Sequence, residues 1–285
     1  MVNNSIHHFL VAVCLSLLAT GNMHAQTFWA KDLGGPGNDH VTDVKTDGAG
    51  NIYATGEFSG SIVFGGTTYV STAGIDMFLA KGALVLEPNY RGSAGYGEKF
   101  RSLNVRNLGI GDAWDVLSGI DALVQQGIVN RDRVGSMGWS QGGYISAFLT
   151  TRHSDRFKAI SVGAGISDWM TYYVNTDIHP FTRQYLKATP WDDPKIYADT
   201  SPMTYIKQAR TPTLIQHGDQ DARVPIPNAF QLYQGLRDQH VPVQLSIFKG
   251  FGHGINKPKA NRAAMQQNLD WFSRYLWNQP AGTQR

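Results

Sequence analysis

The sequence predicts an α/β domain with a mostly parallel sheet over residues 79–279, preceded by a short all-β segment over residues 27–78. Charged residues make up 16% of the 285 residues and hydrophobic residues 42%, which is typical of a folded globular chain. From residue 83 onward, short apolar runs alternate with amphipathic helical patterns, which predicts helices on both faces of a parallel sheet. Residues 27 to about 75 are rich in Gly, Thr, Asp and Val, and their short alternating runs predict antiparallel strands.

The N-terminus predicts an export signal over residues 1–25 and therefore a periplasmic or extracellular location. Residues 9–20 form an apolar run that is short for a membrane span, and the small and polar residues after it allow cleavage near Ala25. Histidines stand where such signals usually carry Lys or Arg, and a short membrane anchor is the alternative. No other segment is apolar enough to cross a membrane.

The single cysteine, Cys14, lies inside this segment. The mature chain would then have no thiol, which excludes a disulfide framework, a cysteine nucleophile and a thiolate metal site. The net charge is +3 and the Lys and Arg residues are scattered, so the sequence predicts no nucleic-acid surface.

The segment 27–78 resembles one repeat of a bacterial β-propeller family. Strands are expected at residues 41–47, 51–58 and 61–64, with tight turns between them. The units W-A-K, G-G-x-G-N-D and D-x-x-G-N-x-Y-x-T-G-x-F of that family match residues 29–31, 34–39 and 47–58. Residues 78–81 are similar in sequence to residues 28–31, which would be the start of a second repeat, but no second copy follows. Propellers need about four to eight blades, so this predicted blade is solitary.

The α/β segment is expected to contain the following strands and helices. Strands are predicted at residues 83–88, 133–137, 159–162, 212–216 and 243–248. Helices are predicted at residues 112–126 with Gly127 as a C-terminal cap, at residues 143–149, around Phe230, Tyr233 and Leu236, and around Met265, Leu269, Phe272 and Leu276.

The motif G-W-S-Q-G at residues 138–142 stands between a predicted strand and a predicted helix. This pattern is typical of a nucleophile elbow, in which glycines leave room around a serine on a sharp turn. A lone motif of this kind is weak, because small residues cluster in many ordinary turns.

A serine hydroxyl needs a base to take its proton and an acid to orient that base. Asp221 and His253 each follow a later predicted strand, and the order Ser140, Asp221, His253 is that of α/β-hydrolase triads. Taken singly, His253 could be an ordinary loop residue and Asp221 a helix cap, and Asp219 competes for the acid role. Three motifs in this order, each at a strand end, favour a triad.

Residues 80 to about 278 resemble the catalytic domain of the prolyl oligopeptidase family, especially its dipeptidyl- and acylaminoacyl-peptidase branches. The matching motifs lie at residues 88–97, 138–144, 217–225 and 252–254. The resemblance implies an α/β-hydrolase fold with Ser140 as nucleophile, His253 as general base and then acid, and Asp221 as its orienter. It also implies a peptide substrate and an oxyanion site formed by the backbone N–H of Gln141 and by Tyr90.

Three further side chains are candidates for substrate binding through the same resemblance. Arg223 would contact a substrate main-chain carbonyl, although it could equally be a surface arginine. Trp169 and Tyr172 would line the pocket on the P1 side, although aromatic residues after a strand are more often simple packing. Nothing in the sequence suggests a metal site or a bound cofactor.

The chain departs from the family because the three strands and the helix that normally precede residue 80 are missing. Either a strand of the blade fills the gap, or the strand beginning at residue 83 pairs directly with residues 134–137, or the domain folds poorly. The sequence accordingly predicts an exported serine-type peptidase. The alternatives are a catalytically impaired fusion fragment, an esterase, or a binding module built on the blade. The P1 preference and the oligomeric state are left open.

Overall fold

The computed structural model describes residues 84–277 and, before them, five strands. The chain divides into two compact units, Met1–Asn89 and Tyr90–Arg285. The predicted export signal at residues 1–25 lies outside the described residues. No helix in the described part of the chain is long and apolar enough to cross a membrane.

The first unit contains two small antiparallel sheets. The strands β1 (His40–Thr46), β2 (Ile52–Phe58) and β5 (Asp76–Leu79) form one sheet in the order β1-β2-β5, and β3 (Ser61–Phe64) pairs with β4 (Thr67–Val70). The strands expected at residues 41–47, 51–58 and 61–64 are therefore present. Residues 76–79 pair with β2, with Phe78 opposite Gly56. That these strands form a propeller blade stays a prediction.

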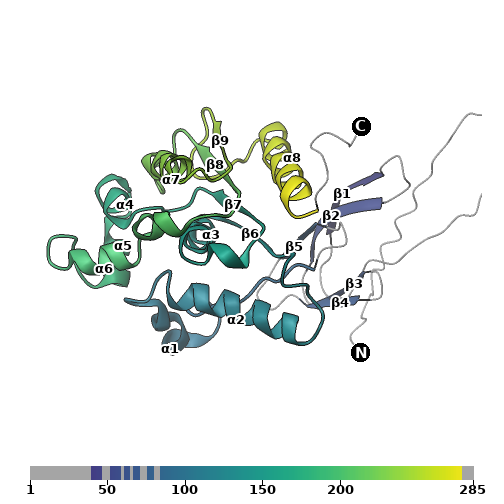
Figure 1. Ribbon diagram of the computed structural model, residues 1–285, viewed down its shortest axis with the longest axis horizontal. Coiled ribbons are helices and arrows are strands. Elements are labelled where there is room, and N and C mark those ends of the chain that lie inside the picture. The colour runs from purple at the N-terminus through teal and green to yellow at the C-terminus, as the bar shows by residue number, and fades with distance from the viewer. Residues whose placement is uncertain are drawn as a thin grey trace, which may run out of the picture. The chain divides into compact units, whose positions relative to one another are not determined.

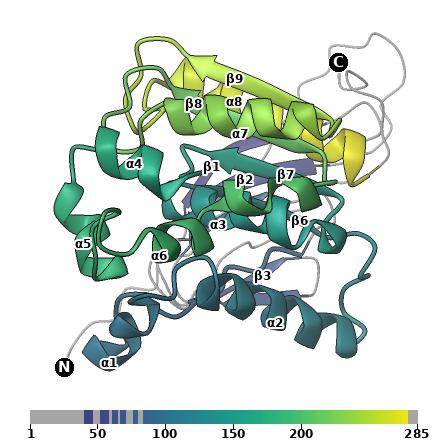
Figure 2. The ribbon, with the colours of Figure 1, turned by 60° about the vertical axis from the view of Figure 1, so that its left-hand side comes forward.

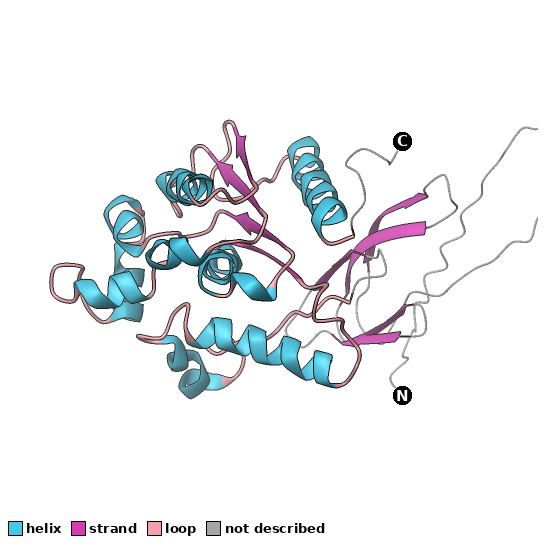
Figure 3. Ribbon diagram, viewed as in Figure 1, coloured by secondary structure: helices cyan, strands magenta, loops and turns pink. Residues whose placement is uncertain are grey.

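The second unit is built on a four-stranded parallel sheet, drawn in magenta in Figure 3. Its strands are β6 (Gly135–Trp139), β7 (Ala159–Gly163), β8 (Thr213–Gly218) and β9 (Val243–Phe248), in the order β6-β7-β8-β9. The two inner strands, β7 and β8, are buried along their whole length. Because all four strands are parallel, their carboxyl ends meet at one edge of the sheet.

Helices cover both faces of this sheet (Figures 1 and 2). The helices α3 (Gln141–Arg152) and α7 (Pro227–Asp238) lie on one face, and α8 (Pro258–Tyr275) lies on the other. A further helix, α2 (Gly111–Gln125), packs beside α3. Its C-terminal Gly127 adopts φ +72°, as expected of a glycine after a helix. The main core contains Tyr144, Phe148, Ile160, Ile215 and Leu232.

The last two predicted helices are present, and the structure shows which of their apolar residues are buried. Phe230 and Met265, two of the residues that mark these helices in the sequence, are both exposed. In α7 the buried apolar residues are Ala229, Leu232 and Leu236. In α8, Trp271 and Phe272 pack against Ala159 and Leu214 of the sheet. The spacing of apolar residues in the sequence does not determine which of them face the core. The sheet against which the helix packs determines it.

The strand predicted at residues 83–88 is also wrong. Residues 84–90 have no regular secondary structure, and Leu84, Val85 and Leu86 are exposed. Among the described residues, β6 pairs with β7 alone, and its Met137 is 59% exposed. Residues 84–88 therefore form no strand that could pair with β6. An apolar run becomes a strand only where a neighbouring backbone satisfies its N–H and C=O groups.

The segment between β7 and β8 lies at the carboxyl edge of the sheet and is mostly helical. It contains α4 (Trp169–Asn175), α5 (His179–Leu186), α6 (Pro194–Asp199) and the 3-10 helix η3 (Pro202–Gln208). The Asp168 side chain caps α4 by accepting the N–H of Thr171 at 2.7 Å. Three short elements complete the unit: α1 (Gly97–Arg101), η1 (Ser102–Asn104) and η2 (Ser154–Arg156). Together, α4, α5 and the loops after β6, β8 and β9 surround one pocket.

Candidate active site

Ser140 stands on a sharp turn between β6 and α3. Its backbone adopts φ 59° and ψ −114°, a conformation that residues other than glycine rarely adopt. A Cβ atom on Gly138 would lie 2.3 Å from the backbone of Gly142, so the turn requires a glycine there. The Ser140 N–H donates to the Gly163 carbonyl at 2.9 Å, which ties the turn to β7. The turn has the geometry of a nucleophile elbow.

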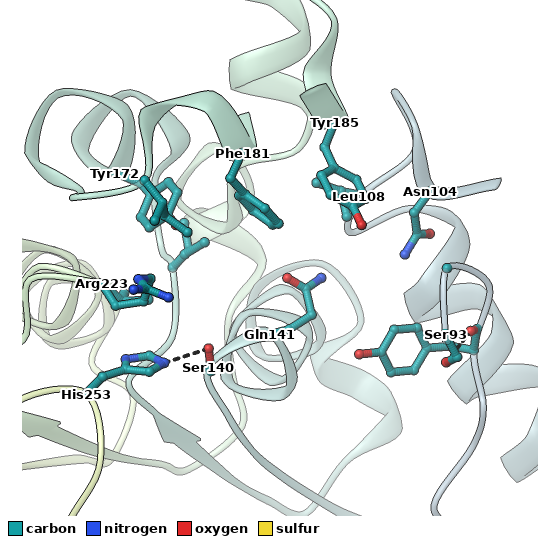
Figure 4. A pocket seen from close by; sticks show the side chains of 15 residues that line it. Ser93, Asn104, Leu108, Ser140, Gln141, Tyr172, Phe181, Tyr185, Arg223 and His253 are labelled. Carbon is teal, nitrogen blue, oxygen red and sulfur yellow. Dashed lines mark hydrogen bonds between the residues drawn. The ribbon is translucent and has the colours of Figure 1, made fainter. Parts of the chain in front are cut away.

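A chain of two hydrogen bonds runs from Ser140 through His253 to Asp221. Ser140 Oγ lies 2.8 Å from His253 Nε2, the bond drawn in Figure 4, and His253 Nδ1 lies 2.8 Å from Asp221 Oδ2. Because Asp221 accepts the Nδ1 proton, Nε2 of a neutral His253 is free to accept the serine hydroxyl. The three residues follow β6, β8 and β9, whose carboxyl ends lie at the same edge of the sheet.

The structure brings Asp221 to His253 and leaves Asp219 away from it. Asp221 is buried, and its Oδ1 accepts the N–H groups of Arg223 and Val224 at 2.9 Å each. Asp219 Oδ1 instead accepts the N–H of Gly250 at 2.6 Å. Asp221 thus orients His253, and Asp219 ties the end of β8 to the loop after β9.

Two residues near the triad received no role from the sequence. The indole N–H of Trp139 donates to the backbone carbonyl of His253 at 2.7 Å. His217 Nε2 donates to the Val224 carbonyl at 2.7 Å, and burial lowers the pKa of His217, which keeps the ring neutral. Both residues stand inside recognisable motifs, but nothing local in the sequence indicates these partners. They hold the loops that carry His253 and Asp221.

A pocket of about 270 Å³ opens beside Ser140 and His253. Tyr90, Gln141, Tyr172 and Arg223, all candidates from the sequence, line it, and Figure 4 shows the last three. The other lining residues are Gly92, Ser93, Asn104, Leu108, Ile166, Ile178, Phe181, Tyr185 and Val224.

Trp169 does not line the pocket, contrary to the sequence-based expectation. Its side chain is fully buried, with its ring centroid 5.3 Å from that of Tyr144 and 5.4 Å from that of Tyr172. Both contacts are edge-to-face, a favourable arrangement for aromatic rings. Trp169 therefore packs beneath the pocket and supports Tyr172 at its wall.

The two polar candidates, Tyr90 and Arg223, differ in their surroundings. Burial, followed by the negative charge of Asp112, raises the pKa of Tyr90 to about 12, so its hydroxyl stays protonated and able to donate. Arg223 is exposed, and its Nε donates to Asp177 Oδ1 at 2.8 Å. This ion pair fixes the guanidinium at the mouth of the pocket.

The described residues contain no group of three His, Cys, Asp or Glu side chains arranged to hold a metal ion. What the site does contain is a hydroxyl, an imidazole and a carboxylate in series. Such a series can transfer a proton away from an attacking hydroxyl.

The chain is similar to several known peptidases. It is 29% identical over 195 residues to an acylamino-acid-releasing enzyme of Arabidopsis thaliana, covering 66% of this chain and 26% of that one. It is 31% identical over 202 residues to an uncharacterized peptidase, YuxL, of Bacillus subtilis, covering 69% of this chain and 31% of that one. The chain thus spans roughly a quarter to a third of the length of these relatives.

Solved structures show the same fold. An acylaminoacyl peptidase of Pyrococcus horikoshii superposes with a TM-score of 0.64 at 25% identity, covering 84% of this chain and 42% of that one. A puromycin hydrolase superposes with a TM-score of 0.66 at 17% identity, covering 90% of this chain and 42% of that one. The four-stranded parallel sheet and its helices therefore form an α/β-hydrolase-like fold.

A model of the prolyl oligopeptidase family matches residues 69–279, which include the whole second unit up to the end of α8. The predicted resemblance to its catalytic domain is confirmed. The chain belongs to the prolyl oligopeptidase family.

Proposed function

We propose that this chain is a serine peptidase that cleaves peptide bonds through an acyl-enzyme, with Ser140, His253 and Asp221 as its catalytic triad. The observation that carries the proposal is the pair of 2.8 Å hydrogen bonds joining the three side chains at the sheet edge. Membership in a family of serine peptidases supports the reaction class.

In the proposed first step, Ser140 Oγ attacks the carbonyl carbon of the substrate while His253 Nε2 takes the hydroxyl proton. The developing oxyanion receives hydrogen bonds from the Gln141 N–H and the Tyr90 hydroxyl. The Gln141 N–H is the first of α3, and the first N–H groups of a helix have no partner inside the helix. The tetrahedral intermediate then collapses as its C–N bond breaks, and His253 gives the proton to the leaving amine.

In the second step, water replaces the amine. His253 takes a proton from the water, whose oxygen attacks the acyl carbon of the Ser140 ester, and the proton returns to Ser140 Oγ as the ester bond breaks. Asp221 accepts the Nδ1 proton of His253 throughout and stabilises the imidazolium while it exists. Arg223 and Tyr172, which line the same pocket, are proposed to contact the peptide substrate.

A fluorophosphonate probe tests the proposal directly, because it modifies a serine only where that serine is activated. We expect labelling of the purified protein at Ser140, located by mass spectrometry, and no labelling of the Ser140→Ala variant. A folded wild-type protein that stays unlabelled would indicate the alternative, a family member without a working site. Hydrolysis of p-nitrophenyl esters without hydrolysis of N-acyl peptide anilides would indicate an esterase.

We also propose that residues 1–25 direct export to the periplasm or the outside of the cell. The apolar run at residues 9–20 and the small residues that follow support this proposal. Mass spectrometry of the N-terminus of the protein after expression in a Gram-negative host tests it. Mature chains that begin near Gln26 are expected, and chains that keep Cys14 would contradict the proposal.

A further inference from the structure

One side of the pocket beside Ser140 carries neutral polar groups that have no partner in the protein. Asn104 is only 3% exposed, and its Oδ1 is buried without a hydrogen bond. The Nε2 of Gln141 is likewise buried without a partner. Figure 4 shows both side chains, with Tyr185, on the side of the pocket away from Arg223 and His253. One hydrogen-bond acceptor and one donor, on two residues that line the same pocket, thus have no partner.

Buried polar atoms in folded proteins nearly always have a partner, so two such atoms on residues that line one pocket call for an explanation. The chain holds both side chains in position. A Cβ atom on Gly92 would lie 2.4 Å from Asn104 Nδ2, so the close approach of Asn104 depends on glycine at that position. Gln141 follows Ser140 directly and begins α3. A bound group that donates to one amide and accepts from the other would satisfy both.

The position of the triad indicates which part of a substrate reaches these amides. His253 must protonate the leaving amine, so the leaving group lies on the His253 side of the pocket. The carbonyl oxygen of the bond to be cleaved points toward the backbone N–H of Gln141. The opposite side, with the side chains of Asn104 and Gln141, is then left for the side chain of the residue whose carbonyl carbon Ser140 attacks.

The charged groups around the pocket indicate which kinds of substrate side chain this side of the pocket can bind. No carboxylate is found among the described residues that line the pocket, so a basic side chain would lose its hydration without gaining a partner. The guanidinium of Arg223 is already paired with Asp177 and lies on the other side. An apolar side chain would displace water and leave both amide groups unpaired. An uncharged side chain with its own donor and acceptor fits best.

We propose that this pocket selects a carboxamide side chain, that of glutamine or asparagine, at the residue whose carbonyl carbon Ser140 attacks. The NH₂ group of the substrate amide donates to Asn104 Oδ1, and its oxygen accepts from Gln141 Nε2. If both protein amides turn by 180°, the substrate amide turns with them and the pairing is kept. This inference rests on the proposed peptidase function and specifies the substrate class of the peptidase.

Equilibrium binding to the Ser140→Ala variant tests the selectivity without any chemistry. The ligands are the N-acetyl methylamides of glutamine, methionine and glutamate, which share a similar length but differ in hydrogen bonding and charge. We expect the glutamine compound to bind at least about 10-fold more tightly than the other two, because sites built to bond a polar group discriminate strongly against analogues that lack it. Equal binding of the three compounds, or no saturable binding of the glutamine compound, overturns the proposal.

Side-chain variants locate the effect. Gln141→Leu keeps the backbone N–H of residue 141 but removes its amide, and Asn104→Leu removes the acceptor. In the Ser140→Ala background, each should reduce the glutamine-to-methionine affinity ratio by about 10-fold. Gln184→Leu is the matched control, since Gln184 is an exposed amide on α5 that does not line the pocket, and it should leave the ratio unchanged. If circular dichroism shows that Asn104→Leu does not fold, Gln141→Leu alone tests the proposal. An unchanged glutamine-to-methionine affinity ratio in Gln141→Leu would contradict the proposal.

Fluorophosphonate labelling of the wild-type protein separates this proposal from the one on which it rests. Labelling of Ser140 together with equal binding of the three compounds removes the selectivity and leaves the peptidase. Preferential binding of the glutamine compound without labelling removes the peptidase and leaves the recognition site. If Ser140 is labelled and the glutamine compound binds preferentially, kcat/KM for N-acetyl-glutamine p-nitroanilide should exceed kcat/KM for N-acetyl-methionine p-nitroanilide by at least about 10-fold.

Discussion

At the scale of single residues, the contacts of each side chain separate groups that look alike in the sequence. Asp219 and Asp221 stand two positions apart after β8, yet Asp221 Oδ2 lies 2.8 Å from His253 Nδ1 while Asp219 Oδ1 accepts the Gly250 N–H. Trp169 and Tyr172 share one helix, yet only Tyr172 lines the pocket. A side chain two residues further along a turn points in a different direction, so proximity in sequence does not assign a role.

The two aspartates should respond differently to the same substitution. Asp221→Asn should lower kcat by about 10⁴-fold, because an amide favours the wrong tautomer of His253. Asp219→Asn should change kcat by less than about 10-fold, since it still offers an oxygen to Gly250. Initial rates on an N-acetyl peptide anilide, with both variants checked for folding, measure this. The reverse order of the two effects would overturn the triad assignment.

A third aspartate, Asp112, gives the protein a specific dependence on pH. It lies fully buried in the first turn of α2, and burial raises its pKa from the ordinary 3.8 to about 7. The folded state then keeps a proton that the unfolded chain loses above about pH 4, so the free energy of unfolding should fall as the pH rises from about 4 to about 7.

Asp112→Asn should remove this part of the pH dependence. Asparagine keeps an oxygen for the N–H of Ala113, which Asp112 Oδ1 accepts at 2.8 Å, and it carries no charge at any pH. Urea unfolding at pH 5 and at pH 8 measures the effect. The loss of stability between the two values should be smaller in the variant than in the wild type, and an equal loss would contradict the raised pKa.

At the scale of elements, the elbow shows how backbone packing fixes a nucleophile. A Cβ atom on Gly143, in the first turn of α3, would lie 2.1 Å from the carbonyl oxygen of Gly163 in β7. A Cβ atom on Gly142, one residue earlier, would meet nothing within 4 Å. Of these two glycines, only Gly143 is required for the close approach of the helix to the strand.

These two glycines form a matched pair for a stability measurement. Gly143→Ala should lower the free energy of unfolding by about 1–3 kcal/mol, because backbone atoms must move to admit the methyl group. Gly142→Ala should leave it unchanged or raise it by up to about 1 kcal/mol, since alanine favours a helix over glycine. Chemical unfolding followed by circular dichroism compares them, and equal effects would show that close packing at Gly163 is not what requires glycine.

The elements themselves were largely predictable, and the exceptions have one cause. Four of the five strands predicted after residue 80 occur within a few residues of their expected positions, as do the main helices, because buried strands and amphipathic helices have distinct periods. The segment at residues 83–88 has the composition of a buried strand but is not one. Its expected partner, β6, pairs with β7 alone among the described residues, and pairing is not encoded locally.

At the scale of the whole molecule, the chain consists of two units that divide at Asn89 and Tyr90. The exposed apolar residues Leu84, Val85 and Leu86 lie just before this boundary, outside regular secondary structure. Exposed chain without regular secondary structure is the usual site of proteolytic nicking. Among the described residues, the boundary is therefore where the intact protein should be cut first.

Limited proteolysis with a protease that cleaves after leucine should first cut the chain at residues 84–86. A protected fragment that begins near residue 87 and includes β6 to α8 should accumulate, since β7 and β8 are buried along their length. Mass spectrometry of the early fragments identifies the cuts. First cuts inside residues 135–218 would show that the second unit is less stable than its buried sheet implies.

By itself, the sequence determined the class of the fold, the order of most of its elements and the three residues proposed as the triad. These features depend on local periodicity and on short motifs, so they can be read without knowing any distant contact. Only the tertiary structure decided that Trp169 packs below the pocket and that Asn104 joins Gln141 in its wall. Such contacts join residues far apart in the chain, as does the 2.7 Å hydrogen bond between Trp139 and His253, which are 114 positions apart. Which distant groups meet depends on how the parallel sheet and its helices pack, and no short segment of sequence carries that information.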